Sequence, residues 1–440
     1  MLKRSGACYN ADKPREQIEV SLMKLIGLLS LCALGYWLFM LWDTLRSRRW
    51  MFSLPHFAGN TALQTLIRRM SPSGDPREEL ARKQALFDYP LVSVIIAAKE
   101  EESTIADTVK HLLNQTYPRL EIIAVNDRSQ DATGSKLDEL RNWSESRDGI
   151  AIPLRIIHIT SLPSGWIGKN HALYQGYAQA RGSILLFTDA DVLFAPDAVS
   201  DAVAYLQQER ADHLTLAPRM TTRGFWLKAF VQYFFFTLCL YIRPWRSNDD
   251  LQHEHGMGVG AFNMMTRKAY EKIGTHRDFA MRPDDDLELG RRVKRLRLRQ
   301  RLASGASHIE VEWYKNLPEA IRGLEKNLFS GFGYRLWLAG LGILGQLLLF
   351  FLPLVGWLWA PGWAAWGFGA SALLLLIVYL LLIRSITGEG GRELVALPAT
   401  ILLLVYVVLR SVLLTLSQGG IYWRGTFYSL RELRSMRSRE

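Results

Sequence analysis

Two aspartates separated by one residue, Asp189 and Asp191, are the side chains of this sequence that most directly suggest chemistry. They follow the apolar run 184–187, so we expect a buried strand to end where they begin. In an extended segment residues i and i+2 point to the same side, and both carboxylates can then reach one hard cation such as Mg²⁺ or Mn²⁺. Because such cations commonly bridge substrate phosphates, the pair predicts a metal and diphosphate site.

Three further apolar runs, 92–96, 121–125 and 154–159, have the length and the Val, Ile and Leu content of buried strands. Helical patterns alternate with these runs, which predicts an α/β domain with a mostly parallel sheet. Ligands of such sheets bind beyond the carboxyl ends of the strands. Asp127 follows the second run, where its carboxylate can accept hydrogen bonds from a nucleobase or a ribose, although a solvated turn uses the same residue types.

Two other groups could join this site. Gly168 and Lys169 precede a helical pattern, so backbone amides and one ammonium group could face a phosphate at a helix start. Asp284, Asp285 and Asp286 open a second helical pattern that becomes strongly basic further on. Acids at a helix start complement the helix dipole, but three adjacent aspartates exceed what capping requires. Crowded like charges raise one another's pKa, and one of these carboxylates could act as a general base.

Long uncharged runs predict that the chain is bound to a membrane. Residues 25–42 suffice for one helical span, and we interpret them as an anchor rather than a cleavable signal peptide because no small-residue cleavage pattern follows. Residues 336–360 and 361–383 predict a helical hairpin in the membrane. Arg410 interrupts the run 394–416, so this segment is either a third span or a helix lying partly at the interface.

The formal net charge of +11 fits a protein that faces anionic lipid headgroups and anionic substrates. The basic residues cluster beside the apolar runs, and no zinc or helix-turn-helix pattern is present, so we expect no nucleic-acid partner. Arginines after the first span favour a cytoplasmic catalytic domain, in an integral protein of the bacterial inner membrane. Three full C-terminal spans would place the basic tail outside, against the same rule, whereas an interfacial or re-entrant last helix would keep it inside.

Residues 225–242 are apolar, highly aromatic and short for a span. We interpret them as an interfacial helix that brings a membrane-embedded acceptor to the site, with a buried core helix as the alternative. The expected organisation of the chain is an N-terminal tail (1–24), a membrane anchor (25–42), a linker (43–87), a catalytic domain (88–335), C-terminal membrane helices (336–416) and a basic tail (417–440).

Five motifs, in this order, resemble those of glycosyltransferase family 2, the inverting enzymes of GT-A fold. They are Val-Ser-Val-Ile-Ile-Ala-Ala-Lys-Glu-Glu-Glu (92–102), Asn-Asp-Arg-Ser-Gln-Asp-Ala-Thr (126–133), Gly-Lys-Asn (168–170), Thr-Asp-Ala-Asp (188–191) and Asp-Asp-Leu-Glu-Leu-Gly (285–290). The order of apolar runs is similar to the membrane-bound branch that acts on ceramide, carotenoid and hopanoid acceptors. The resemblance implies an inverting transfer from a nucleotide-diphosphate sugar, with UDP as the expected nucleotide, to a hydroxyl of a lipid-like acceptor.

The resemblance also implies roles for individual residues. Asp127 matches the acid that contacts the nucleoside, and Asp189 and Asp191 match the metal and diphosphate motif, with Asp191 as the more direct ligand. Asp286 aligns with the Asp of the family's Glu-Asp pair, the base that deprotonates the acceptor. Here Asp285 replaces the Glu, so the identity of the base stays open between the two. Further donor contacts are expected from Ala98, Glu101 and Lys169.

Three other functions are alternatives to lipid glycosylation: polysaccharide synthesis, nucleotidyl transfer and a non-catalytic scaffold role. The Gln-x-x-Arg-Trp motif of processive members is missing, which disfavours a polysaccharide synthase. Trp423-Arg424-Gly425 resembles a Trp-Arg-Gly element of the lipid-directed branch, so Trp423 and Arg424 are expected near the acceptor. A nucleotidyltransferase would release pyrophosphate instead of a nucleoside diphosphate, and a non-catalytic membrane scaffold would release neither.

Overall fold

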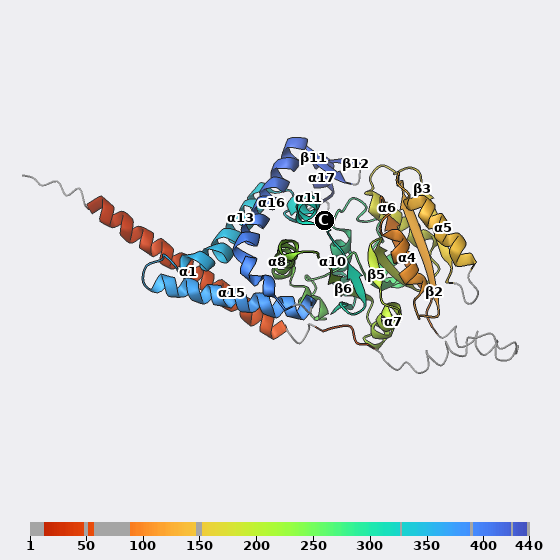
Figure 1. Cartoon of the computed structure of the whole chain (residues 1–440), viewed down its shortest axis with the longest axis horizontal. Helices are drawn as coiled ribbons and strands as arrows, with labels where there is room; N and C mark the ends of the chain where they lie inside the picture. The colour runs from red at the N-terminus through yellow and green to blue at the C-terminus, as the bar shows by residue number, and fades with distance from the viewer. Residues whose placement is uncertain are drawn as a thin grey trace, which may run out of the picture.

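A computed structural model describes residues 13–47, 52–56, 89–146, 152–325, 328–387, 390–423 and 426–437. Two parts are visible in Figure 1: a sheet domain on the right and long apolar helices on the left. The seven-stranded sheet has the order β3-β2-β1-β4-β8-β6-β9. Its strands are β1 (Val92–Ala98), β2 (Leu120–Asp127), β3 (Leu154–Ile159), β4 (Ile184–Asp189), β6 (His213–Ala217), β8 (Asn263–Thr266) and β9 (Gln300–Ser304).

The sheet is mostly parallel, as predicted. Strand β1 pairs in parallel with β2 and β4, β2 with β3, and β6 with β9, whereas β8 runs antiparallel to both β4 and β6. All four apolar runs that we expected to be strands are strands of this sheet. A smaller sheet has the order β5-β10-β7, formed by β5 (Val192–Phe194), β7 (Arg219–Met220) and β10 (Ile309–Val311).

Helices cover both faces of the sheet, which explains why its central strands are apolar throughout rather than alternating. Successive side chains of a strand point to opposite faces. In β1, Val94 and Ile96 pack with α4, α5 and α7, whereas Ile95 packs with α6, α9 and α10. These helices are α4 (Ile105–Leu113), α5 (Thr133–Glu145), α6 (Gly168–Gln179), α7 (Ala198–Gln208), α9 (Arg267–Lys272) and α10 (Asp285–Arg295).

Five helical segments of the described chain are long and apolar enough to cross a membrane: Gln17–Ser47, Phe225–Ile242, Leu336–Gly356, Trp363–Ser385 and Arg392–Gln418. They match the apolar runs predicted for the membrane and the run 225–242, except that residues 357–362 form the turn between the two helices of the predicted hairpin. The elements of this part and its connections are α1 (Lys13–Ser47), α8 (Phe225–Ile242), η2 (Pro244–Asn248), α11 (Leu317–Glu325), α12 (Leu328–Gly331), α13 (Leu336–Gly345), η3 (Gln346–Phe351), α14 (Leu352–Gly356), α15 (Trp363–Thr387), η4 (Arg392–Ala396) and α16 (Leu397–Gln418).

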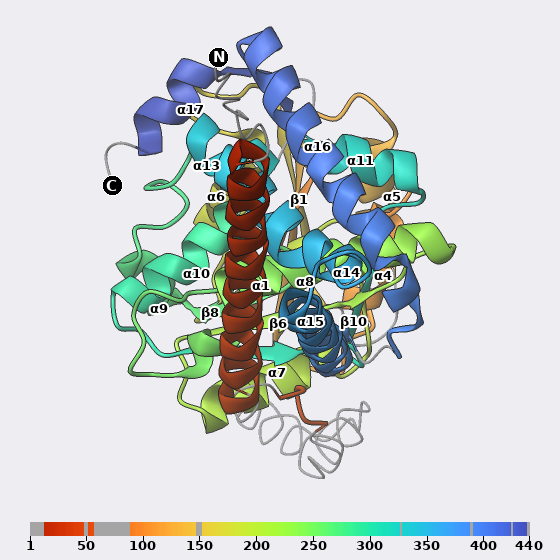
Figure 2. The ribbon, with the colours of Figure 1, turned by 90° about the vertical axis from the view of Figure 1, so that its left-hand side faces the viewer.

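Helix α1 is joined to the C-terminal helices by hydrogen bonds as well as by apolar packing. Pro353 has no N–H group for the carbonyl of Leu349, four residues earlier. The indole Nε1 of Trp37 in α1 donates to that carbonyl at 2.7 Å. Ser30 Oγ of the same helix donates to the Ala364 carbonyl of α15 at 2.9 Å. Helix α1 and the C-terminal apolar helices therefore form one packed unit, with α1 in front in Figure 2.

Helices α15 and α16 run in different directions: Figure 2 shows α15 nearly end-on and α16 along its length. Arg410, the charge that interrupts this apolar run, forms an ion pair with Glu325 of α11. Beyond α16, a hairpin of β11 (Gly420–Trp423) and β12 (Thr426–Ser429) leads into α17 (Leu430–Arg437). Ile421 and Tyr428 of this hairpin pack in one cluster with Ile167 of the sheet domain. The tail thus lies against the sheet domain, as an interfacial α16 would allow, and the position of α16 in a membrane stays a prediction.

The central strand β4 offers a test of the core. Leu186 is fully buried, and Leu186→Ala removes apolar atoms and leaves a cavity. We expect the free energy of unfolding of the sheet domain to fall by about 2–5 kcal/mol. The measurement is urea-induced unfolding in detergent, followed by tryptophan fluorescence. Leu251→Ala, at a side chain that is 85% exposed, is the control and should change little. Equal losses in both variants would contradict this core.

Candidate active site

Charged side chains from three elements meet at the carboxyl edge of the sheet. Asp189 ends β4, Lys169 lies in the first turn of α6, and Asp285 and Asp286 open α10. They share a small pocket whose lining residues are Lys169, Leu173, Phe187, Thr188, Asp189, Gly260, Asn263, His276, Asp285, Asp286 and Leu289. The structure therefore brings together four of the residues that we predicted for the site from the sequence. More than one hundred positions separate Lys169 from Asp286 along the chain.

Lys169 is the positive centre of this pocket. Its Nζ lies 2.8 Å from Oδ1 of Asp189 and 3.6 Å from Oδ1 of Asp285. Burial opposes the ammonium charge, but the surrounding carboxylates outweigh it and raise the pKa of Lys169 above its ordinary value. The lysine is consequently protonated at neutral pH, and it offers a fixed positive charge where a substrate phosphate could bind.

The two adjacent aspartates of α10 differ in their surroundings. Asp285 is buried, and its Oδ2 lies 3.9 Å from Nε2 of His276. Burial is the main cause that raises the pKa of Asp285 to about 7, against the opposing effect of Lys169. Burial, together with the positive charge of Lys169, lowers the pKa of His276 to about 3, so its ring is neutral. Asp285 therefore exchanges a proton near neutral pH in a site closed to solvent.

Asp286 is only partly buried, and the loop 256–260 fixes its orientation. The backbone N–H of Gly260 donates to Oδ2 of Asp286 at 2.8 Å, and the N–H of Leu287 donates to Oδ1 at 2.8 Å. Burial raises the pKa of Asp286 as well. Gly258 must be glycine here, because a Cβ at this position would lie 2.0 Å from the Asp286 carbonyl oxygen. Asp286 is thus an oriented, partly buried carboxylate that lines the pocket.

Asp127, the residue expected to contact the nucleoside, lies at the same carboxyl edge of the sheet. Asp127 is buried at the end of β2, and Arg128 donates to both of its oxygens, with Nε at 2.7 Å from Oδ1 and an NH2 group at 3.1 Å from Oδ2. Gly168 allows α6 to begin beside it, since a Cβ there would lie 2.2 Å from Oδ2 of Asp127. The backbone of Gly168 also hydrogen-bonds the hydroxyl of Tyr428.

Tyr428 belongs to the C-terminal hairpin, and sequence reasoning did not identify it. No local pattern marks a tyrosine that reaches the site from a hairpin about 260 residues further along the chain. The nearby Trp-Arg-Gly element is the sequence signal that points to this part of the tail. Trp423 ends β11, while Arg424 lies outside the described residues, so their role near the acceptor stays a prediction.

Ala98 is the last residue of β1, and Glu101 lies in the loop that follows this strand. Ala98 is fully buried as the last residue of β1, and the N–H of Glu101 donates to Thr133 Oγ1 at 2.8 Å. The loops after β1 and β2 are further joined by a bond from the Gln130 N–H to Glu100 Oε1 at 2.9 Å. Glu101 thus helps to join the loops after β1 and β2, whereas Ala98 is a buried residue of β1, and donor contact by either residue stays a prediction.

The Asp189 and Asp191 pair differs in one respect from the expectation. Strand β4 ends at Asp189, and Asp191 lies in the turn before β5. The alternation of an extended strand therefore does not fix the direction of Asp191, because the chain turns between the two residues. Asp189 contacts Lys169, and both aspartates are only partly buried.

The donor set of the pocket fits a hard divalent cation. Asp189, Asp285 and Asp286 provide carboxylate oxygens, whereas Lys169 supplies a single positive charge among them. Mg²⁺ and Mn²⁺ prefer such oxygen ligands and tolerate remaining positions filled by water or substrate phosphate. The residues that line the pocket are therefore compatible with such an ion, whereas Asp191 is not among them and its part in metal binding stays a prediction.

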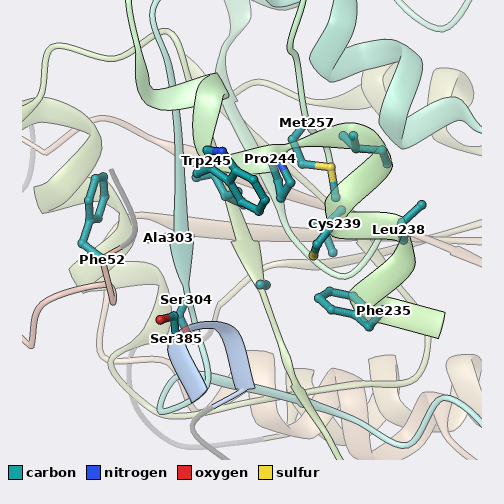
Figure 3. A pocket seen from close by; sticks show the side chains of 14 residues that line it. Phe52, Phe235, Leu238, Cys239, Pro244, Trp245, Met257, Ala303, Ser304 and Ser385 are labelled. Carbon is teal, nitrogen blue, oxygen red and sulfur yellow. The ribbon is translucent and has the colours of Figure 1, made fainter. Parts of the chain in front are cut away.

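An apolar cavity lies on the other side of the loop 256–260. Its empty volume is about 610 Å³, a figure that includes open solvent at its mouth. Figure 3 shows Phe235, Leu238 and Cys239 of α8 on one wall, with Trp245 and Met257 near them. The remaining lining residues are Phe52, Ala217, Ile242, Pro244, Val259, Leu302, Ala303, Ser304 and Ser385.

Successive residues of the loop 256–260 face the two sites in turn. Gly258 and Gly260 approach Asp286 and Asp189, whereas Met257 and Val259 line the apolar cavity. The charged pocket and the apolar cavity are therefore separated by one stretch of backbone.

Known proteins resemble parts of this chain. Residues 93–274 match the sequence profile of Glycosyl transferase family 2. Probable glycosyltransferase YdaM of Bacillus subtilis is 40% identical over 111 residues, 25% of this chain. Beta-monoglucosyldiacylglycerol synthase of Nostoc sp. is 29% identical over 151 residues, 33% of this chain. 4,4'-diaponeurosporenoate glycosyltransferase of Staphylococcus aureus is 24% identical over 262 residues, 58% of this chain.

The matched segments cover 24% of the Bacillus protein, 30% of the Nostoc protein and 66% of the Staphylococcus protein, each less than two thirds. The family match contains Asp127, Lys169, Asp189 and Asp191. It ends before Asp285 and Asp286, so the assignment of those two residues depends on the geometry of the pocket.

The raised pKa of Asp285 predicts a pH dependence of stability. Its pKa is about 7 in the folded chain and 3.8 ordinarily, so the folded state binds more protons between these values. Stability is therefore lost as the pH rises through this window. Asp285→Asn removes the titrating group, and it should raise the melting temperature relative to the native chain more at pH 8 than at pH 5.

The measurement is thermal unfolding in detergent without divalent cations. Asp278→Asn is the control, because that side chain is 57% exposed and should respond alike at both pH values. A gain from Asp285→Asn that is equal at pH 5 and pH 8 would show that Asp285 titrates as it does in water.

Proposed function

Residues 93–274 form a domain of glycosyl transferase family 2, and on this basis we propose that the chain transfers a sugar from a nucleotide-diphosphate sugar to a hydroxyl group of a membrane lipid, with inversion. One observation carries the proposal: Gly260 holds the Asp286 carboxylate in the same pocket as the Lys169 and Asp189 pair. A base and a phosphate-binding cation then border one pocket, and a single displacement needs both, one on each side of the anomeric carbon.

Asp286 is the base of this mechanism. Its carboxylate takes the proton of the acceptor hydroxyl, and the hydroxyl oxygen forms a bond to the anomeric carbon. The bond from that carbon to the diphosphate oxygen breaks at the same time, so the nucleoside diphosphate leaves from the opposite face. Asp285 is too buried to meet an acceptor, and it positions the ammonium group of Lys169 instead.

Asp189 and Asp191 would hold Mg²⁺ or Mn²⁺, which neutralises the charge that develops on the leaving diphosphate. Lys169 adds a fixed positive charge on the same side of the pocket. Asp127, beside the N-terminus of α6, would contact the nucleoside, for which UDP is the proposed nucleotide. Ala98 and Glu101 complete the donor side of this arrangement, while Trp423 and Arg424 belong to its acceptor side.

The apolar cavity supports a lipid acceptor. It is lined by α8, which packs against α15 and α16, and it adjoins the loop that holds Asp286. Two relatives, named for diaponeurosporenoate and for monoglucosyldiacylglycerol, agree with an apolar acceptor. An apolar chain in this cavity would place its hydroxyl end toward the loop, with the catalytic domain on the cytoplasmic face of the inner membrane.

The direct test is nucleotide release by the detergent-purified chain. A panel of nucleotide sugars is offered with Mg²⁺ or Mn²⁺, with and without a membrane lipid extract. Release of a nucleoside diphosphate that the extract stimulates supports the transferase, whereas pyrophosphate release identifies a nucleotidyltransferase. Neither release nor nucleotide binding across the panel would favour a non-catalytic scaffold.

Asp286→Asn tests the base. The amide cannot accept the proton, so lipid-dependent transfer should fall at least about a hundredfold, while the affinity for the donor nucleotide persists. Transfer is measured as labelled sugar in the lipid phase, and donor binding is measured by calorimetry. Asp278→Asn, outside the pocket, is the control and should retain activity. Undiminished transfer by Asp286→Asn would exclude Asp286 as the base.

Leu238→Trp tests the acceptor cavity. The larger side chain fills space next to Cys239, so KM for the lipid acceptor should rise at least about tenfold, whereas slow hydrolysis of the donor by water should be unchanged. Leu238→Met conserves the volume and is the matched control. If the Trp variant used the lipid as well as the Met variant did, the acceptor chain would have to bind elsewhere.

A further inference from the structure

Three side chains outside the active site converge on one point. His56 lies in the described segment 52–56, Asp201 is in α7, and His308 lies between β9 and β10. One ligand atom from each lies within 4.8 Å of the others. His56 Nδ1 is 3.4 Å from Asp201 Oδ2, and His308 Nε2 is 2.9 Å from the same oxygen. None of the three lines the pocket around Lys169.

We propose that His56, Asp201 and His308 bind a Zn²⁺ ion that fastens the segment after the first membrane helix to the sheet domain. Two imidazoles and a carboxylate are a common ligand set for zinc. Metal–ligand bonds of about 2.0–2.2 Å in a tetrahedron place neighbouring ligand atoms about 3.3–3.5 Å apart. The observed separations of 3.4 and 2.9 Å need only a small outward shift of His308 to reach this geometry.

The surroundings of the cluster resemble those of a metal site. Ser307 Oγ lies 3.0 Å from Nδ1 of His308, so this hydroxyl can accept the proton of Nδ1 and leave Nε2 free to bind a metal. Asp197 stands one helical turn before Asp201, and its Oδ2 lies 3.9 Å from His56 Nδ1, within reach of a fourth position. Water can fill that position otherwise.

The burial of the ligands leaves a route for the ion. The side chains of Asp201 and His308 are 6% and 0% exposed, whereas His56 is 49% exposed and closes the cluster from outside. A hydrogen bond between Asp201 and His308 alone would account for that pair. It leaves unexplained why the His56 ring stacks on His308, with centroids 4.3 Å apart, and aims Nδ1 at the same carboxylate.

Backbone hydrogen bonds already join the segment 52–56 to β9, and the proposed metal site would add a side-chain link. Leu54 N–H donates to the Ser304 carbonyl at 2.9 Å, and Ser304 N–H donates to the Phe52 carbonyl at 2.9 Å. The segment 52–56 thus already lies along β9, and His56 is its last described residue. A cation between His56 and α7 would fix this segment, and a short chain stretch separates it from α1. Metal binding of this kind contributes directly to folding stability.

The test is Zn²⁺ binding by the full chain in detergent, after removal of any histidine tag and with excess Mg²⁺ to occupy oxygen sites. A chromophoric chelator competes for the metal, and thermal unfolding is recorded in parallel. The native chain should bind one equivalent of Zn²⁺ and melt at a higher temperature with it. His56→Ala and His308→Ala should each weaken binding at least about a hundredfold and remove the thermal shift.

Two further variants make the result specific. His158→Ala removes a surface histidine that also pairs with one aspartate, Asp138, at 3.4 Å, and it should bind Zn²⁺ as the native chain does. Asp191→Ala should also keep the Zn²⁺ site, which separates this proposal from the proposed sugar transfer. Absence of stoichiometric binding in the native chain, or unchanged binding in His56→Ala, would overturn it. The exposed His56 keeps this test valid if His308→Ala fails to fold.

Discussion

The charged pocket depends on one ammonium group, that of Lys169. Asp189, Asp285 and Asp286 approach one another at the edge of the sheet, and their mutual repulsion would be large without a positive charge among them. Lys169 supplies it from the start of α6, where a glycine lets the helix begin beside Asp127. The donor side and the base are therefore linked through a single buried cation.

The loop 256–260 divides this charged pocket from an apolar cavity. Glycines face α10 so closely that the two backbones touch, and the intervening Met257 and Val259 face the cavity. One backbone segment can therefore orient a carboxylate by a peptide N–H and also form the wall of an apolar site. For an acceptor that is apolar at one end and hydroxylated at the other, both ends would meet their preferred surroundings within a short distance.

The apolar helices and the C-terminal hairpin also contact the region around the two sites. Helix α8 lines the cavity and packs against α15 and α16, and the C-terminal hairpin reaches back to Gly168 through Tyr428. The ion pair of Arg410 with Glu325 lowers the free-energy cost of placing the Arg410 charge within an apolar helix. The apolar helices, the C-terminal hairpin and the sheet domain thus contribute side chains to neighbouring regions at the carboxyl edge of the sheet.

The sequence by itself determined the local elements and the residue types of the site. Apolar runs of strand length predicted β1, β2 and β4, because buried strands of a parallel sheet need apolar side chains on both faces. A similar run predicted β3, which lies at the edge of the sheet and is only partly buried. The positions of Asp127, Lys169, Asp189 and the α10 aspartates could also be predicted, since ligands bind at the carboxyl edge of such a sheet.

Tertiary structure decided the rest, because contacts between distant residues leave no local pattern. Strand β8 inserts antiparallel between β4 and β6, and only the assembled sheet places its preceding loop beside Asp286. The distinction between a buried Asp285 and a more open Asp286 arises from packing, not from two identical letters in a row. Tyr428 and His56 reach their partners for the same reason: packing joins segments that are far apart in the chain.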